Sequence, residues 1–179
     1  METVYIETSV VSYLGATPPT DTLAHQWHVW TEDWWRIRRP LFECVMSAEV
    51  LREAAEGDPE MSRRRLAALD TLTVLRRTPA VDELAEAFLA AGPLPAKAKA
   101  DAVHLAVATV YQVDYLLTWN LKHLANATIL LRLRPFAEQR GWRLPVVCTS
   151  LMRAGTKVRM SWRAWSWAKR NHSPLMFAR

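Results

Sequence analysis

The sequence predicts an α/β domain in which helices cover a central parallel sheet of about five strands. Short apolar segments with β-favouring residues recur along the chain, and longer segments with helical periodicity separate them. Strands that alternate with helices favour a parallel, doubly wound sheet. The chain has 179 residues, 50% of them hydrophobic, which is enough for one domain with a substantial core and short for two.

The first third of the chain predicts two strands and two helices. Residues 3–6 and 42–46 are apolar and predict strands, and residues 21–36 predict a helix between them. The spacing of its aromatic residues by three and four predicts a stripe that packs into the core, formed by Trp27, Trp30, Trp34 and Trp35. Residues 48–55 predict the second helix, with Ser47 as its N-cap.

The middle of the chain continues the alternation. Residues 61–71 predict a helix with a basic face, whose arginines at 63–65 are expected to be solvated. A strand is expected over residues 72–75, followed by an acidic-faced helix over 80–91. Residues 96–111 are rich in alanine and predict a helix that packs closely on the sheet.

The last third predicts the remaining strands, over residues 115–118 and 146–149. Pro135 is expected to break the helical run between them, and Gly141 to end it. In parallel sheets of this kind, ligands bind beyond the carboxyl ends of the strands. Polar residues that follow strands are therefore the candidates for a functional site.

The net charge of +5 is unevenly distributed along the chain. Residues 153–179 contain seven Lys or Arg and no Asp or Glu, so residues 1–152 contain 16 basic and 18 acidic residues. We expect one folded domain over residues 1–152 and a basic, Trp-rich tail over residues 153–179. The role of the tail stays open between an RNA-binding arm, a membrane-surface helix and a disordered extension without a role.

Composition also bears on where the protein works. No run of eighteen apolar residues occurs, and the start lacks the basic and apolar regions of a secretory signal. We therefore expect a cytoplasmic protein that does not span a membrane. Cys44 and Cys148 lie in apolar runs and are expected to be buried thiols, with a disulfide as the less favoured alternative.

Several polar residues are expected at the carboxyl edge of the sheet. Glu7 follows the first strand, Glu53 lies in the helix after the second, Asp101 begins the alanine-rich helix, and Asn120 follows the fourth strand. Oxygen ligands of this kind suit Mg²⁺ or Mn²⁺, whereas clustered carboxylates without a metal would raise one another's pKa. Such an ion supports phosphodiester hydrolysis by activating water and neutralising phosphate charge. Taken alone, each acid is more often a solvated surface residue or a helix cap.

Four sequence blocks resemble those of PIN-domain proteins, in the VapC-like branch. The blocks occur in the family's order, and the resemblance spans about residues 3–150, through residues 4–14, 46–54, 101–108 and 116–126. The resemblance implies a three-layer α/β/α fold. It also implies that Glu7, Glu53 and Asp101 bind the metal, that Asn120 occupies a fourth, more variable ligand position, and that Thr8 hydrogen-bonds near the metal or phosphate.

Two positions depart from the family pattern. The family's usual first acid is Asp, where this chain has Glu7, and the fourth position is often Asp, where this chain has Asn120. An Asn oxygen can ligate a metal, but it adds no charge. These departures motivate an alternative function, a PIN-fold module that binds RNA or a protein without catalysis.

Other polar residues near the predicted site have competing interpretations. Glu49 shares a helix face with Glu53, and we favour Glu53 as the ligand from the family spacing. His104 is expected to be a packed, hydrogen-bonded residue rather than a contact to phosphate or an orienter of a carboxylate. His123 and Asn126 resemble family positions that orient the loop after the fourth strand. His25 and His28 are expected at the surface, and Lys97 and Lys99, which flank the proposed site, are the candidates for contact with the RNA backbone.

The leading hypothesis is a metal-dependent endoribonuclease. The resemblance implies cleavage of single-stranded or loop RNA to leave a 5′-phosphate and a 3′-hydroxyl. It further implies a toxin that a cognate antitoxin holds inactive, and a homodimer.

Overall fold

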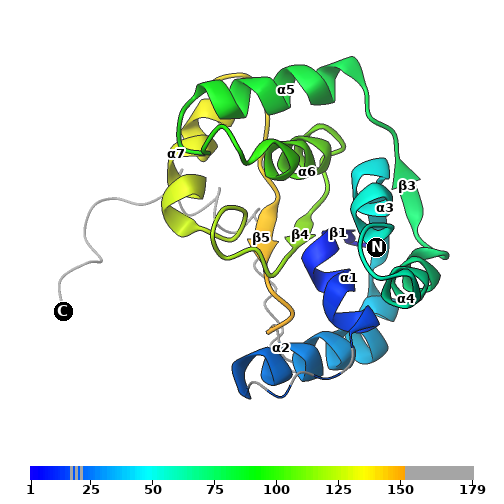
Figure 1. Ribbon diagram of the computed structural model, residues 1–179. Helices are drawn as coiled ribbons and strands as arrows, with labels where there is room; N and C mark the ends of the chain where they lie inside the picture. The colour runs from blue at the N-terminus through cyan, green and yellow to red at the C-terminus, as the bar shows by residue number, and fades with distance from the viewer. Residues whose placement is uncertain (17, 19, 21, 152–179) are drawn as a thin grey trace, which may run out of the picture.

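The computed structural model describes residues 1–16, 18, 20 and 22–151, and its centre is one parallel sheet (Figure 1). The five strands lie in the order β3-β2-β1-β4-β5. Their bounds are β1 Thr3–Ile6, β2 Glu43–Ser47, β3 Thr73–Leu75, β4 Tyr115–Leu117 and β5 Val146–Cys148. The predicted fold class is therefore confirmed.

Helices connect successive strands and cover the sheet. They are α1 Thr8–Gly15, α2 Thr22–Asp33, α3 Ala48–Ala54, α4 Pro59–Leu69, α5 Pro79–Ala90, α6 Lys99–Val110 and α7 Ala127–Glu138. Helices α5 and α6 pack on each other, and α1 packs against α2, α3 and α4. Figure 1 shows α5 and α6 at one end of the domain and α2 at the other, with the sheet between them.

The register of the strands brings the predicted site residues to one edge. Strand β1 lies between β2 and β4, pairing Tyr5 with Val45 and Ile6 with Leu117. All pairings are parallel, so the chain leaves each strand at the same edge of the sheet. Glu7 therefore emerges beside the ends of β2 and β4.

Helix α1 was not expected from the sequence. It begins immediately after Glu7, and its Val10 and Val11 are β-branched residues, which lower helix propensity. Both valines are fully buried in the core. Their burial outweighs a propensity difference of roughly 0.5 kcal/mol per residue.

Two helix boundaries differ from those expected. Pro135 lies inside α7, so the prediction that it breaks the helical run was wrong. It removes only the hydrogen bond to the carbonyl of Leu131, a residue that is 73% exposed, and buried Leu133 and Ala137 anchor the helix around it. Helix α2 ends at Asp33 and continues as a π-helical turn over Trp34–Arg38, followed by a short 3₁₀ turn over Arg39–Leu41.

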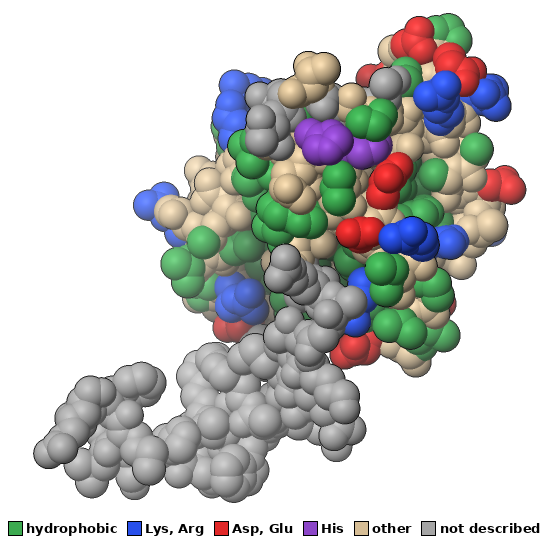
Figure 2. All heavy atoms as spheres, turned by 90° about the horizontal axis from the view of Figure 1, so that it is seen from below, with side chains coloured by type: hydrophobic (Ala, Val, Ile, Leu, Met, Phe, Trp, Pro, Cys, Tyr) green, Lys and Arg blue, Asp and Glu red, His purple; other side chains and the backbone are tan. Residues whose placement is uncertain are grey.

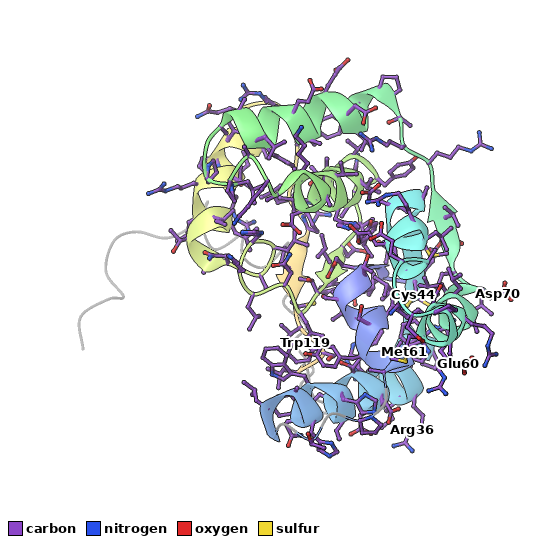
Figure 3. All side chains as sticks on the ribbon, viewed as in Figure 1. Arg36, Cys44, Glu60, Met61, Asp70 and Trp119 are labelled. Atoms are coloured by element: carbon purple, nitrogen blue, oxygen red, sulfur yellow. The ribbon has the colours of Figure 1, made fainter. Side chains whose placement is uncertain are left out.

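The predicted tryptophan stripe packs into the core. Trp34 is buried, and the other three tryptophans of the stripe are partly buried against the core. Trp27 and Trp30 both stack on Trp119, with ring centroids 5.0 Å and 6.4 Å away. The Trp119 indole nitrogen also donates to Thr31 Oγ1 at 2.7 Å. These contacts attach α2 to the loop after β4 (Figure 3).

Two surface predictions were wrong. His28 is buried, and its Nδ1 hydrogen-bonds the Tyr13 carbonyl at 2.8 Å while its Nε2 faces Glu32 at 3.4 Å. Partners for both ring nitrogens remove the cost of burying the imidazole. Arg65 is also not a solvated residue, because its guanidinium donates to the carbonyls of Ala54 and Glu56 and holds α4 against α3.

The remaining predictions concern the cysteines, the tail and the membrane. Cys44 and Cys148 are free and partly buried, and burial raises the pKa of each thiol, to about 11 and about 12. The predicted tail over residues 153–179 lies outside the described residues, so the domain boundary stays a prediction. Among the described helices, none is long and apolar enough to cross a membrane.

Candidate metal site

Glu7 is the most buried carboxylate of the site, with 5% of its surface exposed. Its Oε2 accepts hydrogen bonds from Thr118 Oγ1 at 2.7 Å and from Ser9 Oγ. Ser9 Oγ in turn accepts the backbone N–H of Trp119 at 2.8 Å. The start of α1 and the loop after β4 therefore hold one oxygen of this carboxylate.

Glu53 lies in the last turn of α3 and is held by a second set of residues. Its Oε2 accepts from Thr8 Oγ1 and lies 3.1 Å from His104 Nε2. The other ring nitrogen of His104 lies 2.8 Å from the Tyr5 hydroxyl, which is 2.6 Å from Ser47 Oγ. Ser47 occupies the N-cap position of α3, but its hydroxyl bonds Tyr5 instead of capping the helix as predicted.

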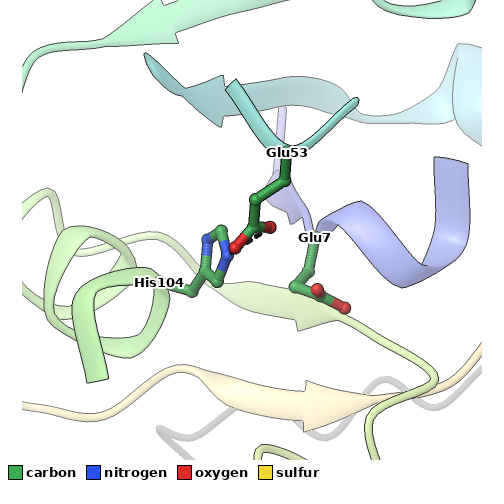
Figure 4. A group of neighbouring side chains, drawn as sticks. All are labelled: Glu7, Glu53 and His104. Carbon is green, nitrogen blue, oxygen red and sulfur yellow. Dashed lines mark hydrogen bonds and ion pairs between the residues drawn. The ribbon is translucent and has the colours of Figure 1, made fainter. Parts of the chain in front are cut away.

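The side chains of Glu7, Glu53 and His104 lie close together (Figure 4). One potential ligand atom from each lies within 4.8 Å of the others. The two glutamates come from different elements, the end of β1 and the end of α3, and His104 comes from α6. Among the described residues, these three form a group of side chains that could bind a metal ion.

The pKa of His104 lies above its ordinary value. Burial lowers it, but the hydrogen bond to Glu53 and the negative charges of Glu7, Glu53 and Asp101 raise it by more. His104 is therefore inclined to carry a positive charge among the carboxylates.

The pKa of Glu53 is lowered, so the expectation that the clustered acids raise one another's pKa is wrong for this residue. Partial burial raises the pKa, but the hydrogen bond and charge of His104, with a smaller effect of the Thr8 hydroxyl, outweigh it. The sequence predicted a packed, hydrogen-bonded His104 and did not address its charge. His104 is packed and hydrogen-bonded as predicted, but it also orients a carboxylate.

Asp101 lies in the first turn of α6 and has its own pair of partners. Its Oδ1 accepts from Asn120 Nδ2 at 2.7 Å, and its Oδ2 lies 2.7 Å from His123 Nδ1. The Asn120 side-chain oxygen accepts the backbone N–H of His123 at 3.1 Å. Asp101 is not in the group that converges within 4.8 Å, although its charge acts on His104.

Other candidate residues lie around this centre. Glu49 forms an ion pair with Arg52 at 2.6 Å and lines a cavity of about 370 Å³ between α3 and α6, together with Val103 and Val107. Lys97 and Lys99 are exposed. Lys97 lies just before α6, and Lys99 begins this helix. On the face in Figure 2, basic and acidic side chains are interspersed, in line with the near balance of charge in residues 1–152.

Sequence reasoning missed the residues that hold the acids. Ser9 and Thr118 bond Glu7, and His123 bonds Asp101. Ser9 lies two residues after Glu7, so the spacing could have indicated a local contact. The contacts of Thr118 and His123 depend on the neighbouring positions of β1, β4 and α6, which no local pattern encodes.

The donor chemistry fits a divalent ion. Glu7 and Glu53 come from two different elements, and their carboxylate oxygens lie close to one another. Mg²⁺ and Mn²⁺ prefer oxygen ligands of this kind. Each of these carboxylates is bonded mainly through Oε2, so its other oxygen has capacity to bind an ion. Asp101 offers a third carboxylate on the neighbouring helix.

Comparisons with known proteins bear on the fold. No protein-family model and no curated protein matches the sequence. The structure is similar to VapC20 of Mycobacterium tuberculosis, a toxin that cleaves the sarcin–ricin loop, with a TM-score of 0.52 and 19% identity over 66% of this chain and 91% of that one. It is also similar to VapBC2 of Rickettsia felis bound to a promoter DNA fragment, with a TM-score of 0.48 and 13% identity over 82% of this chain and 98% of that one.

We compare the fold with that of VapC20, because the likeness spans most of that toxin. The described residues form one all-parallel sheet of five strands with helices packed around it. The described part of the chain therefore has the predicted PIN-like α/β/α fold, which is similar to that of VapC20.

Proposed function

We propose that the protein is a metal-dependent endoribonuclease that acts as the toxin of a toxin–antitoxin pair. The observation that carries this proposal is the approach of the Glu7 and Glu53 carboxylates at the carboxyl edge of the sheet, with Asp101 beside them on α6. Such a group of acids is costly to assemble without a cation. The likeness to VapC20, a toxin that cleaves the sarcin–ricin loop, supports RNA cleavage as the reaction.

Glu7, Glu53 and Asp101 would hold Mg²⁺ or Mn²⁺, with Asn120 bonded to Asp101 at the position where the sequence predicted a fourth ligand. Such an ion supplies an activated water and neutralises charge on the phosphate oxygens. The remaining tasks belong to the chain. Thr118 fixes the direction of the Glu7 carboxylate, and the hydroxyl of Thr8 fixes that of Glu53.

His104 has a separate task in the absence of a metal. It lies between Tyr5 and Glu53 and is inclined to be cationic, so it offsets the repulsion between the carboxylates before an ion arrives. The exposed ammonium groups of Lys97 and Lys99 can attract the phosphodiester backbone to the same end of α6.

The proposed partners follow from the same function. They are an RNA substrate, a cognate antitoxin that covers the acidic site, and a second copy of the chain in a homodimer. The cytoplasm is the proposed location, since RNA and an antitoxin are both available there.

Cleavage of an end-labelled structured RNA in Mg²⁺ or Mn²⁺, with and without EDTA, tests the proposal. We expect cleavage that EDTA abolishes, products with a 5′-phosphate, and loss of cleavage in Glu53→Gln. Glu43→Gln is the matched control, because it removes an exposed carboxylate at the opposite end of β2.

EDTA-resistant cleavage would contradict the metal requirement. RNA binding without cleavage in either metal would instead support the alternative, a non-catalytic binding module.

A further inference from the structure

The loop after β4 contacts two of the site carboxylates through different residues. Thr118 Oγ1 donates to Glu7, and it accepts the backbone N–H of Asn120 at 2.9 Å. Asn120 and His123 then bond the two oxygens of Asp101. One six-residue segment, residues 118–123, therefore fixes acids on both β1 and α6.

The side chain of Asn120 is engaged at both ends. Its Nδ2 donates to Asp101, and its Oδ1 accepts from the backbone of His123. The amide oxygen is the atom that a metal would need, and here it sets the conformation of its own loop. The amide nitrogen, which cannot ligate a metal, points at the carboxylate.

His123 completes the arrangement from the other side of Asp101. Its Nδ1 carries the proton that Asp101 Oδ2 accepts, and the side chains of both residues are 15% exposed. Two donors at 2.7 Å on the two oxygens of one carboxylate fix its rotation. Rotation about the terminal bond is otherwise broad for Asp.

We propose that Asn120 and His123 are positioning residues for Asp101, and that Asn120 supports the metal site through Asp101 rather than as a ligand. This inference rests on the metal site of the proposed function. It accounts for an amide at this position, because an amide can donate to Asp101 and a carboxylate cannot.

Asn120→Asp separates a positioning residue from a ligand. A ligand would gain charge and bind the ion more tightly. A positioning residue would lose its donor and place a second carboxylate against Asp101, which weakens binding. The test measures Mn²⁺ affinity of the full chain by calorimetry, and thermal stability of each variant.

We expect Asn120→Asp, Asn120→Ala and His123→Ala each to weaken Mn²⁺ binding by about tenfold. Leu121→Ala is the control from the same loop, because the Leu121 side chain is 46% exposed and apolar. It should leave Mn²⁺ affinity unchanged.

Tighter Mn²⁺ binding by Asn120→Asp, or unchanged binding by Asn120→Ala and His123→Ala, would overturn the inference. Wild-type protein that binds no Mn²⁺ would overturn it as well. Wild-type protein that binds Mn²⁺ and fails to cleave RNA would contradict the proposed nuclease while the affinities of the variants still decide the role of Asn120.

Discussion

Two histidine–carboxylate pairs lie at the same edge of the sheet and differ in their surroundings. His104 is 1% exposed and bonds Glu53 from within the core, whereas His123 is 15% exposed and bonds Asp101 from a surface loop. His104 also contacts the buried Tyr5 hydroxyl, so the core depends on it. The bond described for the His123 side chain is to Asp101, and the His123 backbone N–H donates to Asn120 within the loop.

We infer from this difference that the His104–Glu53 pair stabilises the fold and that the His123–Asp101 pair supports the metal site. Removal of a buried partner leaves polar groups unsatisfied and costs stability, whereas removal of an exposed partner leaves groups that water can reach. We therefore expect changes at His104 to affect folding and changes at His123 to affect the metal.

The largest expected effect belongs to the carboxylates themselves. Asp101→Asn keeps the size of the side chain and removes its charge, so the fold should persist while RNA cleavage falls by more than about 100-fold. Rates of RNA cleavage in Mn²⁺ and a circular dichroism spectrum check both parts. Wild-type turnover by a folded Asp101→Asn protein would remove Asp101 from the site.

A smaller loss is expected from shortening the first acid. Glu7→Asp withdraws the carboxylate by about 1.5 Å, one C–C step, from the hydroxyls of Ser9 and Thr118. We expect partial cleavage, with a preference that moves from Mg²⁺ toward Mn²⁺, and loss of both binding and cleavage in Glu7→Gln. Full activity and metal affinity in Glu7→Gln would show that Glu7 is not a ligand.

The free energies of unfolding of His104→Gln and His123→Gln test this division of roles. His104→Gln should lower the free energy of unfolding by about 2 kcal/mol, because it disturbs bonds to both Tyr5 and Glu53 in the core. His123→Gln should cost less than about 1 kcal/mol at its more accessible position. Urea unfolding in EDTA measures both, and equal losses would contradict the division of roles.

The smallest expected effect is the pH dependence of the loss of unfolding free energy in His104→Gln. The pKa of His104 is raised, so its stabilising charge is fully present below the ordinary value of about 6.5 and is lost as pH rises through the raised pKa. The pKa of Glu53 is lowered, so its contribution is lost as pH falls below about 4.3. The difference in unfolding free energy between wild type and His104→Gln should therefore be larger at pH 5.5 than at pH 9. A difference that grows toward pH 9 would show that His104 is neutral in the folded protein.

The sequence predicted the strands well because each is a short apolar run, and those of β1, β2 and β4 are mostly buried in the core. Periodicity and alanine content likewise indicated α2 and α6. Helix α1 was missed because its valines favour strands locally and are held in a helix only by burial in the core. Pro135 was misjudged because its effect depends on the exposure of the carbonyl that it leaves unpaired.

The four sequence blocks predicted the acids of the candidate site and the nearby Thr8, but not the contacts that Ser9, Thr118 and His123 make with the acids. Ligand positions follow strand ends, and the parallel topology brings those ends together. The bonds from Thr118 to Glu7 and from His123 to Asp101 join segments 111 and 22 residues apart. The charge of His104 also depends on burial and on three surrounding acids, which only the folded structure places.

Anomalous diffraction from crystals grown with Mn²⁺ tests the central claim most directly. We expect a Mn²⁺ peak at the carboxyl edge of the sheet, roughly 2.1 Å from carboxylate oxygens of Glu7 and Glu53. We further expect that Asp101 faces the ion while Asn120 remains bonded to Asp101. A peak held by other residues, or no peak at this edge in a protein that binds Mn²⁺ in solution, would contradict the account.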